Sequence, residues 1–403
     1  MSEATTYPLS RRIMEMEESA TIRMAQLARD LKAKGHDVID LSLGEPDFDT
    51  PVHIKEAAKK ALDEGYTKYT PVPGLMELRE AIRDKFKRDN GLDYGVNQIV
   101  VSNGAKQSIA NICLSLLDEG DEVIIFSPYW VSYAEIAKMT GATVVPVYAG
   151  IELDYKVTAQ QVERAITPRT RLIIFSSPCN PTGSVYSYEE LTSIAEIVAK
   201  YEHLYVVADE IYEYINFTDK HVSFGTIPQV KDRTITVNGF SKGFAMTGWR
   251  LGYIGAPAWI AAASTKMQGQ FTSGAASFSQ KAAAYALRAD MTPSWEMREV
   301  YRHRRDLVIE LLEQIPGIKV NHPQGAFYIF PDVSGLFGKS DGQMTIHNPD
   351  DLSEYLLHTA HVATVSGAAF GADHCLRFSY AASDENLRKA IGRIAEAVAR
   401  LRG

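Results

Sequence analysis

The stretch Thr234-Ile-Thr-Val-Asn-Gly-Phe-Ser-Lys-Gly-Phe-Ala-Met-Thr-Gly-Trp-Arg250 joins an apolar, β-branched run to a loop that contains Lys242. Successive β-branched residues are typical of a strand that is buried on both faces. A lysine at the end of such a strand is partly removed from water, and burial favours its neutral amine, which can attack an aldehyde. The stretch therefore predicts a buried strand with Schiff-base chemistry at its carboxyl end.

The chain around this stretch alternates between strands and helices from about residue 52 to 290. Candidate strands are 98–101, 122–126, 143–147, 171–175, 204–208 and 234–237. The alternation predicts βα units around a mostly parallel sheet. After about residue 291 the pattern changes to long charged helices, and the last of them is amphipathic, which predicts a second, smaller domain.

The unusual residues of the chain lie directly after these strands. They occupy 102–106, 127–130, 177–183, 209–212 and the lysine loop. Open α/β sheets bind ligands at the carboxyl ends of their strands. Five loops are therefore expected to face one cleft.

Two residues of the lysine loop suit a phosphate group near the aldehyde that Lys242 would attack. Arg250 offers a fixed cation and Ser241 a hydroxyl, and pyridoxal phosphate carries both the phosphate and the aldehyde. The loop resembles the Schiff-base segment of the class I aminotransferases, which are fold-type I pyridoxal-phosphate enzymes. Other motifs extend the resemblance over about residues 40–380, in the pattern of the bacterial aspartate/prephenate subgroup.

The resemblance implies an α/β fold of two domains. A large cofactor-binding domain with a mostly parallel sheet would span 46–290. A smaller α+β domain would combine the C-terminal segment 291–403 with an N-terminal arm and further residues from 1–45.

The resemblance also implies how pyridoxal phosphate would be held. Lys242 would carry the cofactor, and Asp209 would pair with the pyridinium nitrogen so that the ring accepts electrons. Tyr212, with Asn180, would donate to the phenolic oxygen. The remaining cofactor contacts would come from Gly104, Ala105, Lys106, Trp130, Ser241, Arg250 and, from a neighbouring subunit, Tyr69. The last of these implies a homodimer with composite sites. Taken singly, Asp209 could be a helix cap, Trp130 core, and Tyr69 ordinary packing.

The substrate would be an amino acid or its 2-oxo acid. Arg377 matches the arginine that grips the α-carboxylate with a bidentate fork. The other substrate contacts implied are Gly44, Trp130, Asn180, Lys106 and Thr21. Lys106 and Thr21 occupy positions that serve dicarboxylates, or prephenate, in the resembling subgroup, although they could equally be a helix-start lysine and a cap. Glu17 stands where some relatives carry a basic residue, which speaks against a dicarboxylate.

Other functions compete with an aspartate-specific aminotransferase. Prephenate or a broader set of amino acids could be the substrate, and a C–S β-lyase would use almost the same residues. A non-catalytic binding protein would not need every one of these groups. Gly239-Phe-Ser-Lys-Gly243 also matches the nucleophile elbow of serine hydrolases, with Asp332 and His374 as candidate partners, but the chain has no Gly-Gly pair for an oxyanion loop.

The composition narrows the cellular setting. The net charge of -8 disfavours a nucleic-acid partner. Three widely spaced cysteines, Cys113, Cys179 and Cys375, indicate neither a disulfide framework nor a metal site. The sequence shows no signal peptide and no apolar run long enough for a membrane span. We therefore expect a cytoplasmic protein without a membrane or nucleic-acid partner.

Overall fold

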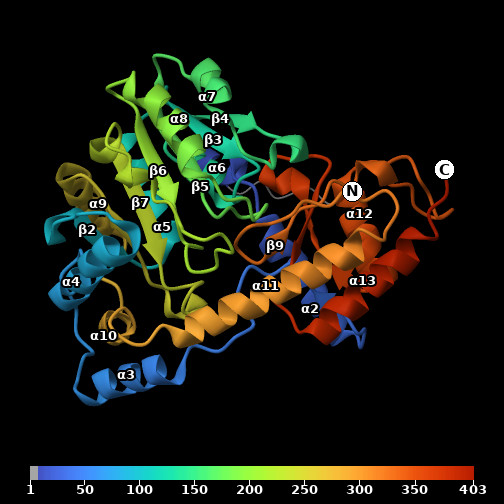
Figure 1. Ribbon diagram of the computed structural model, residues 1–403, viewed down its shortest axis with the longest axis horizontal. Coiled ribbons are helices and arrows are strands. Elements are labelled where there is room, and N and C mark those ends of the chain that lie inside the picture. The colour runs from blue at the N-terminus through green and yellow to red at the C-terminus, as the bar shows by residue number, and fades with distance from the viewer. Residues whose placement is uncertain (1–7) are drawn as a thin grey trace.

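The computed structural model describes residues 8–403 (Figure 1). Within these residues the largest sheet has seven strands in the order β2-β8-β7-β6-β5-β3-β4. The strands are β2 (Ile99–Ser102), β3 (Glu122–Ser127), β4 (Thr143–Tyr148), β5 (Thr170–Ser176), β6 (Tyr205–Asp209), β7 (Thr234–Gly239) and β8 (Gly252–Gly255). All six predicted strands are present, each within two residues of the expected bounds.

Strand β8 is the one member of this sheet that the sequence pattern did not predict. Its four residues include two glycines, which weaken a strand pattern. It pairs antiparallel with both β2 and β7, whereas the pairs from β7 to β4 are parallel. The prediction of a mostly parallel sheet is therefore confirmed, with one antiparallel strand inserted near its edge.

Helices cover both faces of the sheet, as the unbroken apolar runs require. Along β5, Leu172 and Ile174 pack toward α5 (Ala105–Leu116), α6 (Ser132–Lys138) and α9 (Ala258–Phe271). Ile173 and Phe175 point to the other face, toward α7 (Ala159–Ala165) and α8 (Tyr188–Ala199). Successive side chains of a strand point to opposite faces, so each face of the sheet has its own apolar core.

A third apolar cluster lies beside the β2 edge of the sheet. It joins α3 (Val52–Asp63), α4 (Met76–Lys85) and α10 (Ser277–Ala286). Helix α4 continues without a break into a π-helical turn, Phe86–Asn90.

The C-terminal part of the chain forms smaller sheets packed on helices. Strand β1 (Ile39–Asp40) pairs in parallel with β10 (Val362–Ala363), and β9 (Tyr328–Ile329), β11 (Val365–Ser366) and β12 (Leu376–Ser379) form an antiparallel sheet. The helices are α1 (Arg11–Glu15), α2 (Ala20–Ala33), α11 (Thr292–Leu312), α12 (Pro349–Tyr355) and α13 (Asp384–Val398), with a π-helical turn at Leu356–Ala360. Figure 1 shows the long α11 leading from the large sheet to this part.

The predicted amphipathic stripe of the last helix is buried. Leu387, Ile391, Ile394 and Val398 on α13 belong to one core with β9, β10 and β12, and Leu401 joins them beyond the helix end. The side chain of Ser383 caps the helix by accepting a hydrogen bond from the Asn386 N–H.

The pairing of β1 with β10 joins the N-terminal segment to the C-terminal part. The domain boundaries at residues 45 and 290 stay predictions, and residues 1–7 of the predicted arm lie outside the described residues. Among residues 8–403, no helix has both the length and the apolar character that crossing a membrane requires. Cys113, Cys179 and Cys375 are free thiols.

Candidate active site

A cavity of about 340 Å³ opens at the carboxyl ends of the parallel strands. All five loops that the sequence singled out contribute to its wall. The predicted site residues that line it are Thr21, Gly44, Ala105, Lys106, Trp130, Asn180, Asp209, Tyr212, Ser241, Lys242, Arg250 and Arg377. The structure thus brings together residues from both the large sheet and the C-terminal part.

Two predicted residues do not line this cavity. Gly104 precedes α5 and lies against the Arg250 guanidinium, which a Cβ at residue 104 would overlap. Tyr69 lies elsewhere on the surface, and its side chain is 99% exposed. The predicted role of Tyr69 requires a second subunit and stays a prediction.

Lys242 follows β7 and reaches into the cavity. Its ammonium donates to the Gly44 carbonyl and lies 5.7 Å from the centres of the Tyr212 and Phe327 rings. Removal from water, aided by the Arg377 charge, lowers the pKa of Lys242 to about 8. The amine is therefore much closer to its nucleophilic form at neutral pH than a surface lysine is.

Asp209 ends β6 and is buried beneath the cavity. Burial raises the pKa of its carboxyl group to about 6, against hydrogen bonds that favour the ionised form. The donors are the Tyr133 hydroxyl, 2.6 Å from Oδ2, and the Ile211 N–H, 3.2 Å from Oδ1. Ionised Asp209 has no cationic side chain within 4.0 Å among the described residues, so a cationic ligand group would complete its environment.

Tyr133 and Tyr328 are site residues that the sequence reasoning missed. Tyr133 is the second residue of α6 and follows Trp130 by three residues, and that spacing is the one sequence signal for it. Tyr328 lies in the apolar run 326–330, which carries no sequence signal for a site, yet its hydroxyl lies 2.8 Å from the Tyr212 hydroxyl. Both tyrosines line the cavity.

Arg377 on β12 is almost fully buried, with 1% of its surface exposed. Its guanidinium donates to the Asn180 side-chain oxygen at 3.0 Å and to the Ser42 carbonyl at 2.5 Å, while its Nε has no partner. Among residues 8–403, no carboxylate lies within 4.0 Å of it. A buried cation that lacks a counter-ion and faces a cavity calls for an anionic ligand.

A second place for an anion lies at the start of α5. The first N–H groups of a helix have no partner within it, and the helix dipole favours negative charge there. Gly104 takes φ +85° to bring the chain into this turn, and Gly252 on β8 lets the Ala105 nitrogen approach where a Cβ would overlap it. Ser241 and Arg250 line the same cavity. The backbone is therefore shaped to surround a small anion.

Lys106 and Thr21 are the two predicted specificity residues among the cavity lining. The Lys106 ammonium lies 5.0 Å from the centre of the Trp130 ring. Burial, and then the neighbouring Arg250 charge, lower the pKa of Lys106. Glu17 does not line the cavity; its backbone N–H donates to Glu135. The prediction that Glu17 disfavours a dicarboxylate stays a prediction.

The serine-hydrolase alternative has no support in the structure. Asp332 and His374 lie 4.0 Å apart, but neither lines the cavity that contains Ser241. A nucleophile elbow needs a strained backbone at the serine and an α-helix directly after it. Ser241 has neither, since its φ is not positive and the next α-helix, α9, begins at Ala258.

Comparisons with known proteins agree with this geometry. Residues 36–394 match the family model described as aminotransferase class I and II. The chain is 48% identical, over 97% of its own length and 82% of the relative's, to the bifunctional aspartate aminotransferase and glutamate/aspartate-prephenate aminotransferase of Petunia hybrida. It is 44% identical to the aspartate/prephenate aminotransferase of Cereibacter sphaeroides, covering 96% of this chain and 97% of that one.

Solved structures show the same similarity. The aspartate aminotransferase from Rhizobium meliloti superimposes with a TM-score of 0.95 at 41% identity, covering 98% of this chain and all of the other. The Thermus thermophilus aspartate aminotransferase with maleate gives a TM-score of 0.92 at 42% identity, covering 97% of this chain and all of that one.

Proposed function

The chain belongs to the class I and II aminotransferases, and from that membership we propose that it exchanges amino groups between aspartate or glutamate and 2-oxo acids, using pyridoxal phosphate. The observation that carries the proposal is the charge of the cavity. Lys106, Lys242, Arg250 and Arg377 line it together with two carboxylates, Asp209 and Glu45, among the residues described. This excess of positive charge suits a phosphate and a substrate carboxylate bound together.

The residues present fit pyridoxal phosphate. The anion cradle at the start of α5, with Ser241 and Arg250, would hold the phosphate. Asp209 would hold the ring nitrogen, Trp130 would cover the ring face, and Tyr212 with Asn180 would hold the phenolic oxygen. When bound, this cofactor supplies an aldehyde that condenses with amines and a ring that accepts the electron pair of a broken Cα–H bond.

The chain's own residues would then bind the substrate and move its proton. Arg377 would take the α-carboxylate through its two terminal nitrogens and fix the direction of the Cα–H bond. The neutral Lys242 amine would remove the Cα proton, because its lowered pKa lets it act as a base near neutral pH.

The direct test of this function is turnover. Purified enzyme with added pyridoxal phosphate should convert L-aspartate and 2-oxoglutarate to oxaloacetate and L-glutamate, with ping-pong kinetics. Prephenate should be tried as acceptor in parallel, since the related plant and bacterial enzymes are named for it. Release of pyruvate from cystathionine without any acceptor would instead indicate the β-lyase.

The pH dependence of Lys242 provides a second test. Labelling of the cofactor-free protein with pyridoxal phosphate, trapped by borohydride, should rise with pH through a midpoint of about 8, because only the neutral amine reacts. Peptide mass spectrometry locates the label on Lys242, and a midpoint near that of an unperturbed lysine, roughly 10.4, would contradict the lowered pKa.

Lys106 is proposed to read the distal carboxylate of acidic substrates. The Thermus thermophilus relative was solved with maleate, a dicarboxylate. In a closing, water-poor cavity an uncompensated second carboxylate would be costly. Lys106→Ala should therefore lower kcat/KM for aspartate by about 10- to 100-fold more than for alanine. Steady-state assays with both donors decide this, and equal losses would assign Lys106 to cofactor binding, beside Arg250.

A homodimer with composite sites is also proposed. Tyr69 is 99% exposed on a loop whose neighbours are held firmly, since the Gln280 side chain donates to Thr70 at 3.0 Å. An ordered loop that presents an exposed tyrosine suits a contact with a second copy, where the Tyr69 hydroxyl would donate to the phosphate. A cytoplasmic location stays a prediction.

A further inference from the structure

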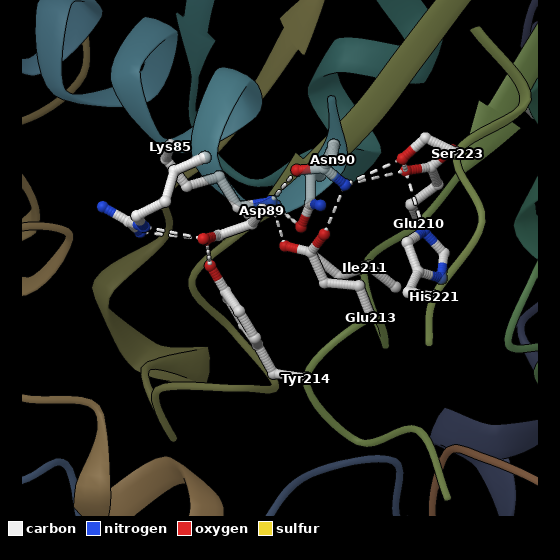
Figure 2. A network of polar contacts seen from close by, with 12 residues as sticks. Lys85, Asp89, Asn90, Glu210, Ile211, Glu213, Tyr214, His221 and Ser223 are labelled. Carbon is white, nitrogen blue, oxygen red and sulfur yellow. Dashed lines mark hydrogen bonds and ion pairs between the residues drawn. The ribbon is translucent and has the colours of Figure 1, made fainter. Parts of the chain in front are cut away.

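At the end of β6 and in the turn that follows it, some residues face the cavity and others face a buried polar network behind it. Asp209 and Tyr212 line the cavity. Glu210 and Glu213 do not, and both are buried on the far side, where Figure 2 shows them among polar side chains. The Glu213 N–H donates to the Glu210 carbonyl at 2.9 Å, so one tight turn holds both pairs. Movement of the acidic pair would therefore move the two cavity residues.

The centre of this network is an ion pair between Glu213 and Lys85. Lys85 is fully buried and the Glu213 side chain is 3% exposed. The Lys85 ammonium also donates to the Asn90 side-chain oxygen at 2.6 Å. The π-helical turn that ends α4 brings residues five apart onto one side, which places Lys85 and Asn90 together.

Asn90 links the two acidic residues. Its amide nitrogen lies 2.7 Å from Glu213 Oε2, 3.3 Å from Glu210 Oε2 and 2.8 Å from the Ser223 hydroxyl. Glu210 further accepts from Ser223 at 2.6 Å and lies 2.9 Å from His221 Nε2. Glu210, Glu213 and His221 lie close enough to suggest a metal site. However, the Asn90 amide donates to both carboxylates, so the oxygens already have partners.

A second contact reaches the lysine loop. The Tyr214 hydroxyl donates to Asp89 Oδ2 at 2.6 Å, within the same π-helical turn. The Tyr214 ring packs against Gly243, where a Cβ would lie 2.6 Å from ring carbon Cδ2. Gly243 directly follows Lys242. The end of α4 therefore contacts both the turn that contains Tyr212 and, through Tyr214, the loop that contains Lys242.

We propose that Lys85, Asn90 and Glu213 are positioning residues, which fix the Asp209–Tyr212 turn relative to Lys242. The proposal rests on the proposed aminotransferase function. A buried ion pair resists displacement because separating it leaves an uncompensated charge in the interior. Reacting groups must be held within about 0.5 Å of their working geometry, and a misplacement of about 1 Å can cost about 100-fold in rate.

The test compares two matched acid-to-amide changes in the enzyme loaded with pyridoxal phosphate. Glu213→Gln removes the charge that Lys85 needs. Glu122→Gln is the control. Glu122 is also buried, and it accepts hydrogen bonds from Thr167 and Arg169, but it lies at the amino end of β3, whereas the cavity lies at the carboxyl ends of the strands. The measurements are kcat and KM for aspartate, the visible circular dichroism of the bound cofactor, and the melting temperature.

Glu213→Gln should lower kcat by about 10- to 100-fold with KM within about threefold, and should reduce the cofactor circular dichroism per bound cofactor. Glu122→Gln should lower only the melting temperature. If both variants change only the melting temperature, the network is structural and the proposal is wrong.

Should Glu213→Gln fail to fold, Asn90→Ala replaces it, since that change leaves the ion pair in place. It should reproduce the fall in kcat and in circular dichroism, and unchanged values would overturn the proposal. Failure of the proposed function is distinct, because the wild-type enzyme itself would then show no cofactor signal and no turnover.

Discussion

Lys242→Ala is expected to abolish transamination, with a loss of at least about 10,000-fold in kcat. The variant lacks both the amine that carries the cofactor and the base that moves the Cα proton. The substitution should not destabilise the fold. The lowered pKa of Lys242 shows that its charged form is less stable in the cavity than in water, so the wild-type lysine already opposes folding at neutral pH. Steady-state assays and thermal melts of the cofactor-free protein measure the two effects.

Lys231→Ala is the matched control for this change, since Lys231 is exposed just before the amino end of the same strand, β7. It should keep full activity and the cofactor absorbance. Retention of substantial turnover by Lys242→Ala would remove the lysine from the mechanism and with it the assignment of the cavity.

Arg377→Lys should lower kcat/KM for every amino acid substrate by about 100- to 1,000-fold, chiefly through KM. Lysine keeps the positive charge but lacks the planar fork that binds both carboxylate oxygens. Burial also makes a lysine at this position more easily neutral, which weakens the remaining attraction. The expected loss is therefore large despite the conserved charge.

Arg233→Lys provides the comparison. Arg233 is partly buried and, like Arg377, donates to a backbone carbonyl, that of Tyr201, but it does not line the cavity. Its kinetics should match those of the unaltered enzyme. If Arg377→Lys raised KM no more than Arg233→Lys does, the α-carboxylate would have to bind elsewhere.

The sequence could predict the large sheet because its strands are buried on both faces, which produces unbroken apolar runs such as 171–175. Strand β8 escaped because its two glycines are required by close neighbours rather than by strand propensity: Gly252 lies against the start of α5, and Gly255 lies against the Tyr94 ring. The strands of the C-terminal part are as short as two residues, too short for any periodicity.

The site was predictable where its residues follow strands and match a familiar order, as Asp209 and Lys242 do. Tyr133 and Tyr328 were not, since each acts through a partner that only the folded chain brings near. The same holds for Lys85, which in the sequence is one more lysine on a charged helix and in the structure is fully buried against Glu213. Contacts between residues that are far apart in the sequence leave no local sequence pattern from which they could be predicted.

The absorbance spectrum of the enzyme loaded with pyridoxal phosphate, before and after L-aspartate is added without any 2-oxo acid, shows whether Lys242 holds the cofactor and whether aspartate is the amino donor. We expect a visible band from the cofactor joined to Lys242, and we expect aspartate to convert it to the band of the cofactor's amine form. A band that aspartate leaves unchanged would contradict the proposed donor. No visible band in cofactor-saturated enzyme would contradict the role of Lys242 itself.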